Sequence, residues 1–393
     1  MYKTIYLKRG KDESLRRFHP WVFSGAIAKV DDGIAEGDVV RVVDFSGDFI
    51  AVGHFQEGSI AVRVLAFDDV EIGVDFFTAR ITVALNMRRS IGLADGDKGN
   101  TYRLVHGEGD SLPGLIIDMY NHTAVMQSHS IGMHLSRQMI VDALRRVYGD
   151  AITAIYYKSE GTLPFVEDIS STDGYLYGSA GDNVACENGL LFHIDWLRGQ
   201  KTGFFIDQRE NRLLLQNYSK GKNVLNMFCY TGGFSVYALK GGATLVHSVD
   251  SSAKAIELTR KNVAMNFPDD NRHDAFCEDA FRFLDGCKDK YDLIILDPPA
   301  FAKHRGALHN ALKGYTRLNV KAFERIRKGG ILFTFSCSQV VSMMHFRNAV
   351  FTAAAQARRQ VRILHFLHQP ADHPINIYHP EGEYLKGLVL YVE

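Results

Sequence analysis

The chain has 393 residues, of which 46% are hydrophobic and 23% charged, as is ordinary for a globular protein. Its 45 basic and 45 acidic residues give no net charge, which excludes binding to nucleic acid through overall charge alone. No apolar run reaches the roughly 18 residues needed to cross a bilayer, and the start, MYKTIYLKRGKDE, lacks the apolar stretch of a signal peptide.

The cysteines are few, odd in number and without a CxxC pair. This pattern excludes a disulfide framework and a zinc ribbon, and we expect no metal site. Free thiols suit a reducing compartment, so we expect a cytoplasmic protein. At about 150 residues per domain, the length predicts two or three domains.

Residues 1–70 contain short apolar runs separated by turns. Residues 39–55 have the pattern strand, Ser-Gly turn, strand, and residues 60–67 form a third strand. We expect a small β-barrel or sandwich. Residues 1–29 hold seven basic and two acidic side chains, so this segment either docks on phosphate or is simply solvated. The candidate RNA contacts in it are Arg9, Arg16 and Arg17.

Residues 71–185 mix helical and strand patterns. Apolar spacing predicts helices over 75–93 and 133–149, the second ending at a glycine. Residues 112–130 predict a hairpin, and 151–158 a further strand. These patterns indicate a central α+β domain.

Residues 186–393 alternate strand and helix patterns, which predicts an α/β domain with a doubly wound, Rossmann-like parallel sheet. The strand candidates are 223–228, 244–249, 291–296 and 330–336, with a further one near HDAFC (273–277) and a terminal pair at 361–366 and 385–393. Ligands of such sheets bind at the carboxyl ends of the strands.

A turn rich in glycine follows the first of these strands, at Cys229–Phe234. It has neither the GxGxxG spacing of a dinucleotide site nor the GK[ST] of a P-loop, so pyrophosphate binding is disfavoured. Asp250 ends the second strand, where a carboxylate can accept both ribose hydroxyls. Asp279, after the third, can accept from an adenine amino group; either acid can alternatively cap a helix. Together these features predict S-adenosylmethionine as cofactor.

The fourth strand runs into Asp297-Pro298-Pro299-Ala300-Phe301, where two prolines fix the backbone and an aromatic ring can stack on a flat substrate. The fifth ends in FSCS, with Cys337 at its tip as a candidate nucleophile or else a buried, inert thiol. A thiolate that attacks carbon 6 of a pyrimidine makes carbon 5 able to accept a methyl group. Asp297 could then select cytosine by bonding to its amino group and ring nitrogen.

Over nearly its whole length the chain resembles the bacterial 23S ribosomal RNA large-subunit methyltransferases of the I type, which make 5-methylcytosine. The matching stretches are HPWVFSGAI (19–27), RLVHGEGDSLPGL (103–115), GQKTGFFIDQREN (199–211), VLNMFCYTGGFSV (224–236), LDPPAF (296–301), LFTFSCS (332–338) and ADHPINIYHPEGEYLKG (371–387). The combination of FSCS, GQKTGFFIDQRE and DPPAF is specific to this family.

The resemblance implies an N-terminal PUA domain that binds RNA (1–70), a central α+β domain (71–185) and a class I methyltransferase domain (186–393). It implies Cys337 as the nucleophile, and places the GQKTGFFIDQR segment over the cofactor, including Asp207 and Arg209. Asp297, from its expected bond to the base, is the second catalytic candidate. The candidate cofactor contacts are Lys201, Phe205, Gln208, Asn226, Phe228, Tyr230, Thr231, Gly232, Asp250, Asp279 and Asp297, and Pro298 and Phe301 are candidate substrate contacts.

One position departs from the wider class of RNA cytosine-5 methyltransferases. Many of these have a second cysteine after the paired prolines, which assists product release, whereas this chain has Ala300. The base that removes the carbon-5 proton is therefore not identified. Two alternatives stay open: an amino-methyltransferase that uses DPP without a thiol, and a non-catalytic RNA-binding assembly factor. The family resemblance also favours a homodimer.

Overall fold

The computed structural model describes residues 2–96, 99–164, 172–179, 181, 183–287, 290–302 and 304–393. It divides into two compact units. Unit 1 comprises residues 1–189, 194–206 and 371–382, and unit 2 comprises residues 190–193, 207–370 and 383–393. Across the described ranges, every helix is too short or too polar to traverse a lipid bilayer. The predicted domain ranges 1–70, 71–185 and 186–393 stay a prediction.

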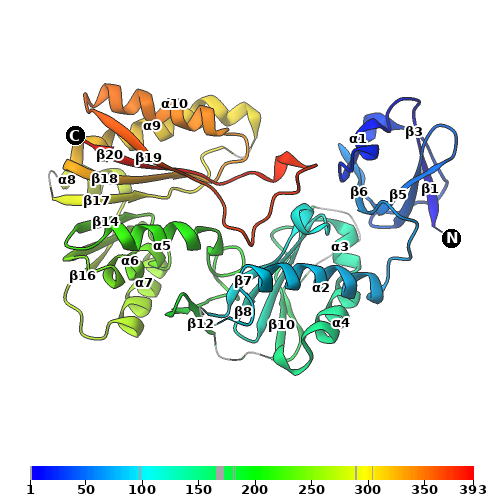
Figure 1. Ribbon diagram of the computed structural model, residues 1–393, viewed down its shortest axis with the longest axis horizontal. Helices are drawn as coiled ribbons and strands as arrows, with labels where there is room; N and C mark the ends of the chain where they lie inside the picture. Colours follow the sequence, from blue (N-terminus) through cyan, green and yellow to red (C-terminus); the bar gives the residue numbers. More distant parts are fainter. Residues whose placement is uncertain are drawn as a thin grey trace. The chain divides into compact units, whose positions relative to one another are not determined.

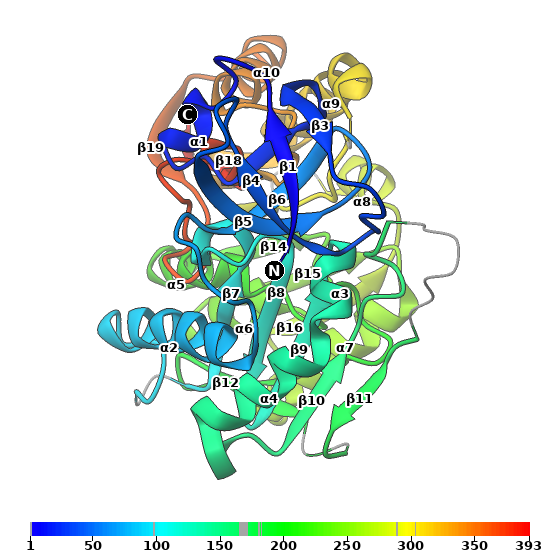
Figure 2. The same cartoon turned by 90° about the vertical axis from the view of Figure 1, so that its right-hand side faces the viewer.

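The N-terminal part of unit 1 is a curled sheet with the strand order β2-β6-β5-β4-β1-β3, part of which faces the viewer in Figure 2. Its interior is aliphatic, with Ile5, Val40 and Val62 fully buried. The predicted strands of residues 39–67 are confirmed. The elements are β1 (Lys3–Leu7), α1 (Glu13–Arg16), β2 (Trp21–Phe23), β3 (Ile27–Val30), β4 (Val39–Val43), β5 (Phe49–Phe55) and β6 (Ile60–Ala66).

The rest of unit 1 is an α+β module, as predicted, with the strand order β11-β10-β9-β8-β7. The hairpin turns at Asn121, whose φ of 56° is in the left-handed region that asparagine tolerates, and the second helix ends at Gly149. The elements are α2 (Val74–Ser90), β7 (Thr101–His106), β8 (Leu115–Tyr120), β9 (Thr123–Ser128), α3 (Ile131–Leu135), α4 (Arg137–Tyr148), β10 (Ala154–Tyr157), β11 (Gly174–Tyr177) and β12 (Val184–Glu187).

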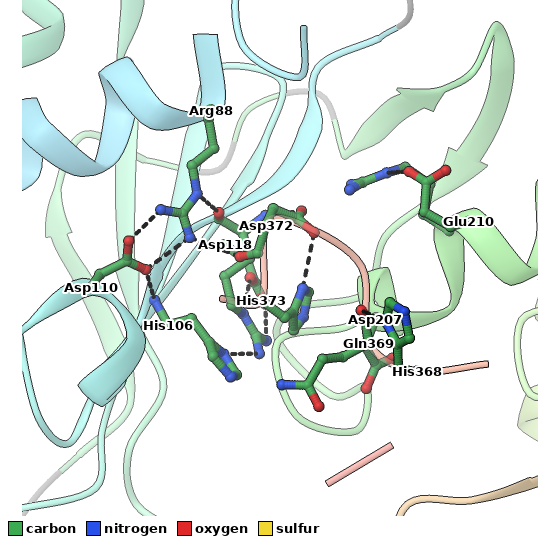
Figure 3. A network of polar contacts seen from close by, with 12 residues as sticks. Arg88, His106, Asp110, Asp118, Asp207, Glu210, His368, Gln369, Asp372 and His373 are labelled. Atoms are coloured by element: carbon green, nitrogen blue, oxygen red, sulfur yellow. Dashed lines mark hydrogen bonds and ion pairs between the residues drawn. The ribbon is translucent and has the colours of Figure 1, made fainter. Parts of the chain in front are cut away.

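A buried polar network in unit 1 holds the segment 371–382 (Figure 3). Arg88, on α2, is fully buried and forms a bidentate ion pair with Asp110. Its Nη2 also donates to the backbone oxygen of Asp372, at 2.7 Å. The Asp372 carboxylate accepts from the backbone N–H of Arg103 at 2.9 Å, and the rings of His106 and His373 lie 5.0 Å apart. Charged hydrogen bonds therefore hold the segment 371–382 within unit 1.

Unit 2 contains a sheet with the order β16-β15-β14-β17-β18-β20-β19. Strands β14 to β18 run parallel, and β20 runs antiparallel to both its neighbours. This confirms the predicted Rossmann-like sheet and its terminal strand pair. The strands are β14 (Asn223–Met227), β15 (Leu245–Asp250), β16 (His273–Cys277), β17 (Tyr291–Leu296), β18 (Ile326–Ser336), β19 (Val361–Leu367) and β20 (Lys386–Val392), and β13 (Leu190–His193) also belongs to unit 2.

Helices cover both faces of this sheet, as Figure 1 shows within unit 2. One layer packs in the core formed by fully buried side chains such as Leu296, Tyr315 and Phe323. Because both faces are covered, the central strands are almost continuously apolar. The helices are α5 (Arg209–Tyr218), α6 (Gly233–Lys240), α7 (Ala253–Asn266), α8 (Ala280–Gly286), α9 (Leu308–Arg325) and α10 (Met343–Gln356).

The network of Arg88 yields a stability prediction. Arg88→Met leaves the carboxylate of Asp110, which is 6% exposed, without its cation, and breaking a buried pair in this way costs ~3–5 kcal/mol. The adjacent Arg89→Met is the control, because its pair with Asp95 is exposed and worth about 1 kcal/mol or less. Chemical denaturation of both variants measures the difference; equal losses would contradict the structural role given to Arg88.

Candidate functional site

The parallel strands of unit 2 end in register at one edge of the sheet. Met227 of β14 pairs with Leu296 of β17, and Leu296 pairs with Thr334 of β18. On the other side, Met227 pairs with Val249 of β15. Neighbouring strands lie ~4.8 Å apart, so the residues that follow these positions gather along one edge. The strand order reverses between β14 and β17, and open α/β sheets bind ligands at such a reversal.

The turn after β14 has an unusual backbone. Phe228, Tyr230 and Gly232 have positive φ values of 59°, 48° and 76°. For the two aromatic residues this conformation costs ~1–2 kcal/mol each, and such strain accumulates at ligand sites. Helix α7 holds the turn: Thr259 Oγ1 donates to the Tyr230 carbonyl oxygen at 2.9 Å, and Asn262 Nδ2 donates to the Thr231 carbonyl oxygen at 2.8 Å.

Asp250 lies at the end of β15 and supports the same turn. One carboxylate oxygen accepts from the backbone N–H of Tyr230 at 3.0 Å, and the other accepts from that of Ser252 at 2.9 Å. The side chain is partly exposed. Since each carboxylate oxygen has a second lone pair, Asp250 can hold the turn and still accept from a ligand.

Asp279 and Asn226 have structural partners. Asp279 Oδ1 caps α8 by accepting from the backbone N–H groups of Phe281 and Arg282, both at 3.0 Å, so the capping alternative is confirmed. Its exposed side chain keeps a second oxygen. Asn226 is fully buried and donates to Ser235 Oγ at 2.9 Å. Among the described residues, its Oδ1 is buried without a hydrogen-bond partner.

Asp297 follows β17 and is linked to the segment that precedes α5. Gln208 Nε2 donates to Asp297 Oδ2 at 3.1 Å, and Asn211 Nδ2 donates to Gln208 Oε1 at 2.7 Å. The neighbouring Asp207 accepts from the hydroxyl of Tyr384 at 2.7 Å. Within unit 2, the DQR end of the GQKTGFFIDQR motif therefore contacts the edge of the sheet that also holds Asp297.

The two candidate substrate contacts after Asp297 differ in exposure. Pro298 is buried, and Phe301 is half-buried. The Phe301 ring packs on Tyr315, with ring centroids 4.6 Å apart, and a Cβ on Gly314 would come within 2.9 Å of it. Tyr315 thus supports one side of the ring.

Cys337 lies directly after β18 and is partly exposed. Its sulfur is 4.0 Å from the carbonyl oxygen of Pro298, so the ends of β17 and β18 meet at this thiol. The flanking serines fix the backbone: Ser336 Oγ donates to the Tyr315 hydroxyl at 2.9 Å, and Ser338 Oγ donates to the Ala302 carbonyl oxygen at 2.5 Å. Burial raises the pKa of Tyr315 to about 12.

Cys229 provides a contrast within the same edge. Its sulfur is buried and lies 3.5 Å from Thr259 Oγ1. Burial raises the pKa of this thiol to about 12, so it stays protonated near neutral pH. Of these two cysteines, Cys337 is the one that solvent reaches.

The remaining predicted contacts lie in unit 1. Lys201 Nζ lies 5.1 Å from the centroid of the Phe205 ring. Arg16 is engaged by two carboxylates, those of Asp12 at 2.5 Å and Asp44 at 2.7 Å. Arg9 stacks over an exposed ring, Phe45, and Arg17 is largely exposed. Among the described residues, no cluster of His, Cys, Asp or Glu side chains is grouped to hold a metal ion.

Sequence reasoning missed two residues that contact the segments of the site, Tyr384 and Lys386. Tyr384 binds Asp207, and Lys386 donates from Nζ to the Ser338 carbonyl oxygen at 2.7 Å. Both belong to the GEYLKG stretch, which we noted only as part of the family resemblance. The signal that could have found Lys386 is a lysine at the start of the apolar run of β20.

Comparison with known proteins identifies the family of the chain. Residues 103–376 match the family described as S-adenosylmethionine-dependent methyltransferase, and residues 5–67 match a PUA-like domain. The ribosomal RNA large subunit methyltransferase I of Aeromonas hydrophila is 40% identical over 398 aligned positions, which cover 99% of each chain. The protein of that name from Escherichia coli is 37% identical and covers 100% of both chains.

Solved structures show the same fold. A Streptococcus mutans protein assigned as a SAM-dependent methyltransferase has a TM-score of 0.84 at 23% identity, over 99% of each chain. A methyltransferase complexed with S-adenosylhomocysteine gives the same values.

The strained turn yields a second stability prediction. A Cβ on Gly232 would come within 2.8 Å of Thr259, whereas Gly221 has a similar φ of 70° and no atom within 4 Å. Gly221→Ala therefore measures the backbone strain alone, ~1 kcal/mol, and Gly232→Ala adds a clash against α7. We expect Gly232→Ala to lower the free energy of unfolding by at least about 1 kcal/mol more; equal losses would mean that the turn can move away from α7.

Proposed function

Since the chain belongs to the ribosomal RNA large subunit methyltransferase I family and is a SAM-dependent rRNA methyltransferase, we propose that it methylates carbon 5 of a cytosine in 23S ribosomal RNA through a covalent adduct with Cys337. The observation that supports this most is the position of the thiol. Cys337 is partly exposed, beside the DPP segment, at the edge of the sheet where class I folds bind ligands.

The turn after β14 fits the cofactor. Glycine at position 232 has a φ of 76° and lets the turn pack against Thr259 of α7, which holds the strained backbone in place. The buried Oδ1 of Asn226, which lacks a partner among the described residues, supports its proposed role as a cofactor contact. We propose that Asp250 accepts the ribose hydroxyls and that the second oxygen of Asp279 accepts from the adenine amino group. The bound cofactor supplies an electrophilic methyl group on a sulfonium.

The other family-implied contacts extend this set. Gln208 connects Asp297 to α5, and Phe228, Tyr230 and Thr231 line the strained turn. Lys201 and Phe205 contact each other, and we propose that they take part in holding the cofactor, as the GQKTG motif implies.

The chain's own residues perform the following steps. The Cys337 thiolate attacks carbon 6 of the cytosine, which forms a carbon–sulfur bond and shifts the electrons of the 5,6 double bond to carbon 5. After carbon 5 has accepted the methyl group, it loses its proton to a base, the double bond re-forms, and the carbon–sulfur bond breaks to release the thiolate. Asp297 accepts from the exocyclic amino group, which uracil lacks. Phe301 stacks on the base, and Pro298 shapes its pocket.

The PUA-like part offers RNA a basic surface. Arg9 and Arg17 have exposed positions, whereas Arg16 is already paired with two acids. We therefore propose phosphate contacts from Arg9 and Arg17 first, with Arg16 mainly ordering the loop that contains Asp44. A cytoplasmic location and a homodimer remain part of this proposal.

The experiment that tests the function is incubation with labelled cofactor and ribosomal RNA, followed by mass spectrometry of the modified base. Label at carbon 5 of cytosine supports the proposal. Label on an exocyclic amino group would instead identify the DPP-dependent amino-methyltransferase, and absence of cofactor binding would identify an assembly factor.

Cys337→Ser tests the nucleophile. A serine hydroxyl is not ionised near neutral pH, so we expect methyl transfer to fall by more than about 1,000-fold. Cofactor affinity, measured by calorimetry, should stay within about twofold, since the thiol is not among the proposed cofactor contacts. The matched control is Cys277→Ser, which replaces an exposed cysteine at the end of β16. Normal turnover by Cys337→Ser would remove Cys337 from the mechanism.

Asp250→Asn tests the ribose contact. Losing charge-assisted hydrogen bonds worth ~1.5–3 kcal/mol should weaken S-adenosylhomocysteine binding by roughly 10- to 100-fold. The same substitution should have a smaller effect on an analogue that lacks the 2′-hydroxyl. The control is Glu257→Gln, which replaces an exposed acid on α7. Equal losses for both ligands would mean that Asp250 acts only by holding the turn.

A further inference from the structure

Strand β20 begins with a buried charge. Lys386 is 2% exposed, and apart from the half-buried Tyr391 the residues that follow it in the strand are also buried. An ammonium group in such surroundings is strongly disfavoured unless its N–H groups are satisfied. A lysine kept there is therefore an unusual feature of the fold.

Two backbone carbonyls hold the side chain in one place. Nζ donates to the carbonyl oxygen of Ser338 at 2.7 Å and to that of Tyr384 at 2.6 Å. An ammonium has three N–H groups, so a third remains for another acceptor. Among the described residues, no carboxylate forms an ion pair with this lysine.

The pairing of β20 with β18 brings Lys386 to Cys337. Ser336 lies directly opposite Lys386 in the antiparallel ladder, and Nζ is anchored on the residue that follows Cys337. Cys337 therefore lies in the chain between the ladder partner of Lys386 and the residue whose carbonyl oxygen accepts from Lys386 Nζ. Hydrogen bonds of Ser336 and Ser338 fix this stretch of backbone.

Within the described ranges, three further ionisable groups interact with members of this pair or with the ring beside it. They are Asp297, which follows β17, the buried Tyr315 of α9, and Glu383, which precedes β20. Burial lowers the pKa of Lys386 to about 8, while Glu383 and the Cys337 thiolate each act to raise it. Electrostatic interaction is mutual, so the ammonium favours the thiolate to the same extent.

We propose that Lys386 is a positioning residue that stabilises the thiolate of Cys337 and so prepares it for attack on the pyrimidine. This proposal rests on the proposed function only for the reaction in which the thiolate is used, the attack on the pyrimidine. The thiol proton leaves to solvent, and Lys386 stays protonated while the carbon–sulfur bond forms and breaks. The ammonium charge that attracts the thiolate is present below pH 8 and is lost as pH rises through the pKa of the lysine.

The test is the pH dependence of Cys337 alkylation by iodoacetamide, read from the Cys337 peptide by mass spectrometry. An opposite charge at close range moves a pKa by about 1 unit or more. We therefore expect Lys386→Met to shift the alkylation midpoint up by about one pH unit and to slow alkylation at pH 7 about tenfold. Lys386→Arg, which stays charged, should keep the lower midpoint.

The same samples contain their own controls. Cys229 and Cys287 are buried, so their protection reports that a variant is folded, and Cys277 is exposed and should not change. Lys321→Met removes an unrelated lysine, which pairs with Asp285. An unchanged Cys337 profile in folded Lys386→Met, or the same upward shift in folded Lys386→Arg, would overturn the proposal. If Lys386→Met fails to protect the buried cysteines, Lys386→Gln is measured under the same criteria.

Methyl transfer provides a second readout. We expect Lys386→Met to lose activity at pH 7 without a change in cofactor affinity, and to recover as pH approaches 9, where the thiol ionises unaided. A loss that is independent of pH would indicate a merely structural lysine. Failure of the proposed function has a different signature: Cys337→Ser would keep its methyl transfer while the alkylation shift persisted.

Discussion

The in-register pairing of β14, β17 and β18 is the constraint on which the site depends. The row Met227, Leu296 and Thr334 sets where each strand ends, and thereby sets the positions of the strained turn, Asp297 and Cys337. A slip of one residue in any strand would turn its side chains to the opposite face. The side chains of these strands are buried and closely packed on both faces, and this specific packing opposes such a slip. Chemistry at the edge is thus a consequence of packing in the middle of the sheet.

Around this edge, polar residues act mainly on backbone. Thr259 and Asn262 donate to carbonyl oxygens of the turn. The serines of FSCS hold the backbone on either side of Cys337. The environment also separates two cysteines of the same edge. Cys229 is buried, and its pKa is raised to about 12. Cys337 is partly exposed and has a lysine beside it. Residue type alone could not distinguish them, whereas burial and charge do.

The sequence was most informative where local pattern determines structure. Strands β14 and β17 follow from largely apolar runs, and the second helix of the central module from its spacing and its terminal Gly149. The beginning of β18 at Ile326 was missed, because Arg327, Lys328 and two glycines interrupt the apolar pattern there and only pairing with β17 makes this stretch a strand. Strands β2 and β3 were missed because they have only three and four residues, and β1 was missed because it lies in the basic segment, which was interpreted by its charge.

Long-range partners could not be predicted. Three contacts join residues far apart in the chain. Arg16 pairs with Asp44, Asp372 forms hydrogen bonds with Arg88 and Arg103, and Tyr384 donates to Asp207. Asp279, in contrast, contacts residues close to it in the chain. Its role as the cap of a helix was one of the two predicted alternatives, and the structure confirms it. Candidate chemistry was therefore visible in motifs, but the residues that tune it depend on tertiary contacts.

The most direct measurement of the central claim is a trapping experiment with RNA that contains 5-fluorocytidine. Fluorine at carbon 5 cannot leave as a proton, so an adduct that has accepted the methyl group cannot expel the thiolate. The account predicts a cofactor-dependent covalent protein–RNA complex, with the nucleotide attached to the peptide that contains Cys337. Methylation of unmodified RNA without any such complex, or attachment at another residue, would contradict it.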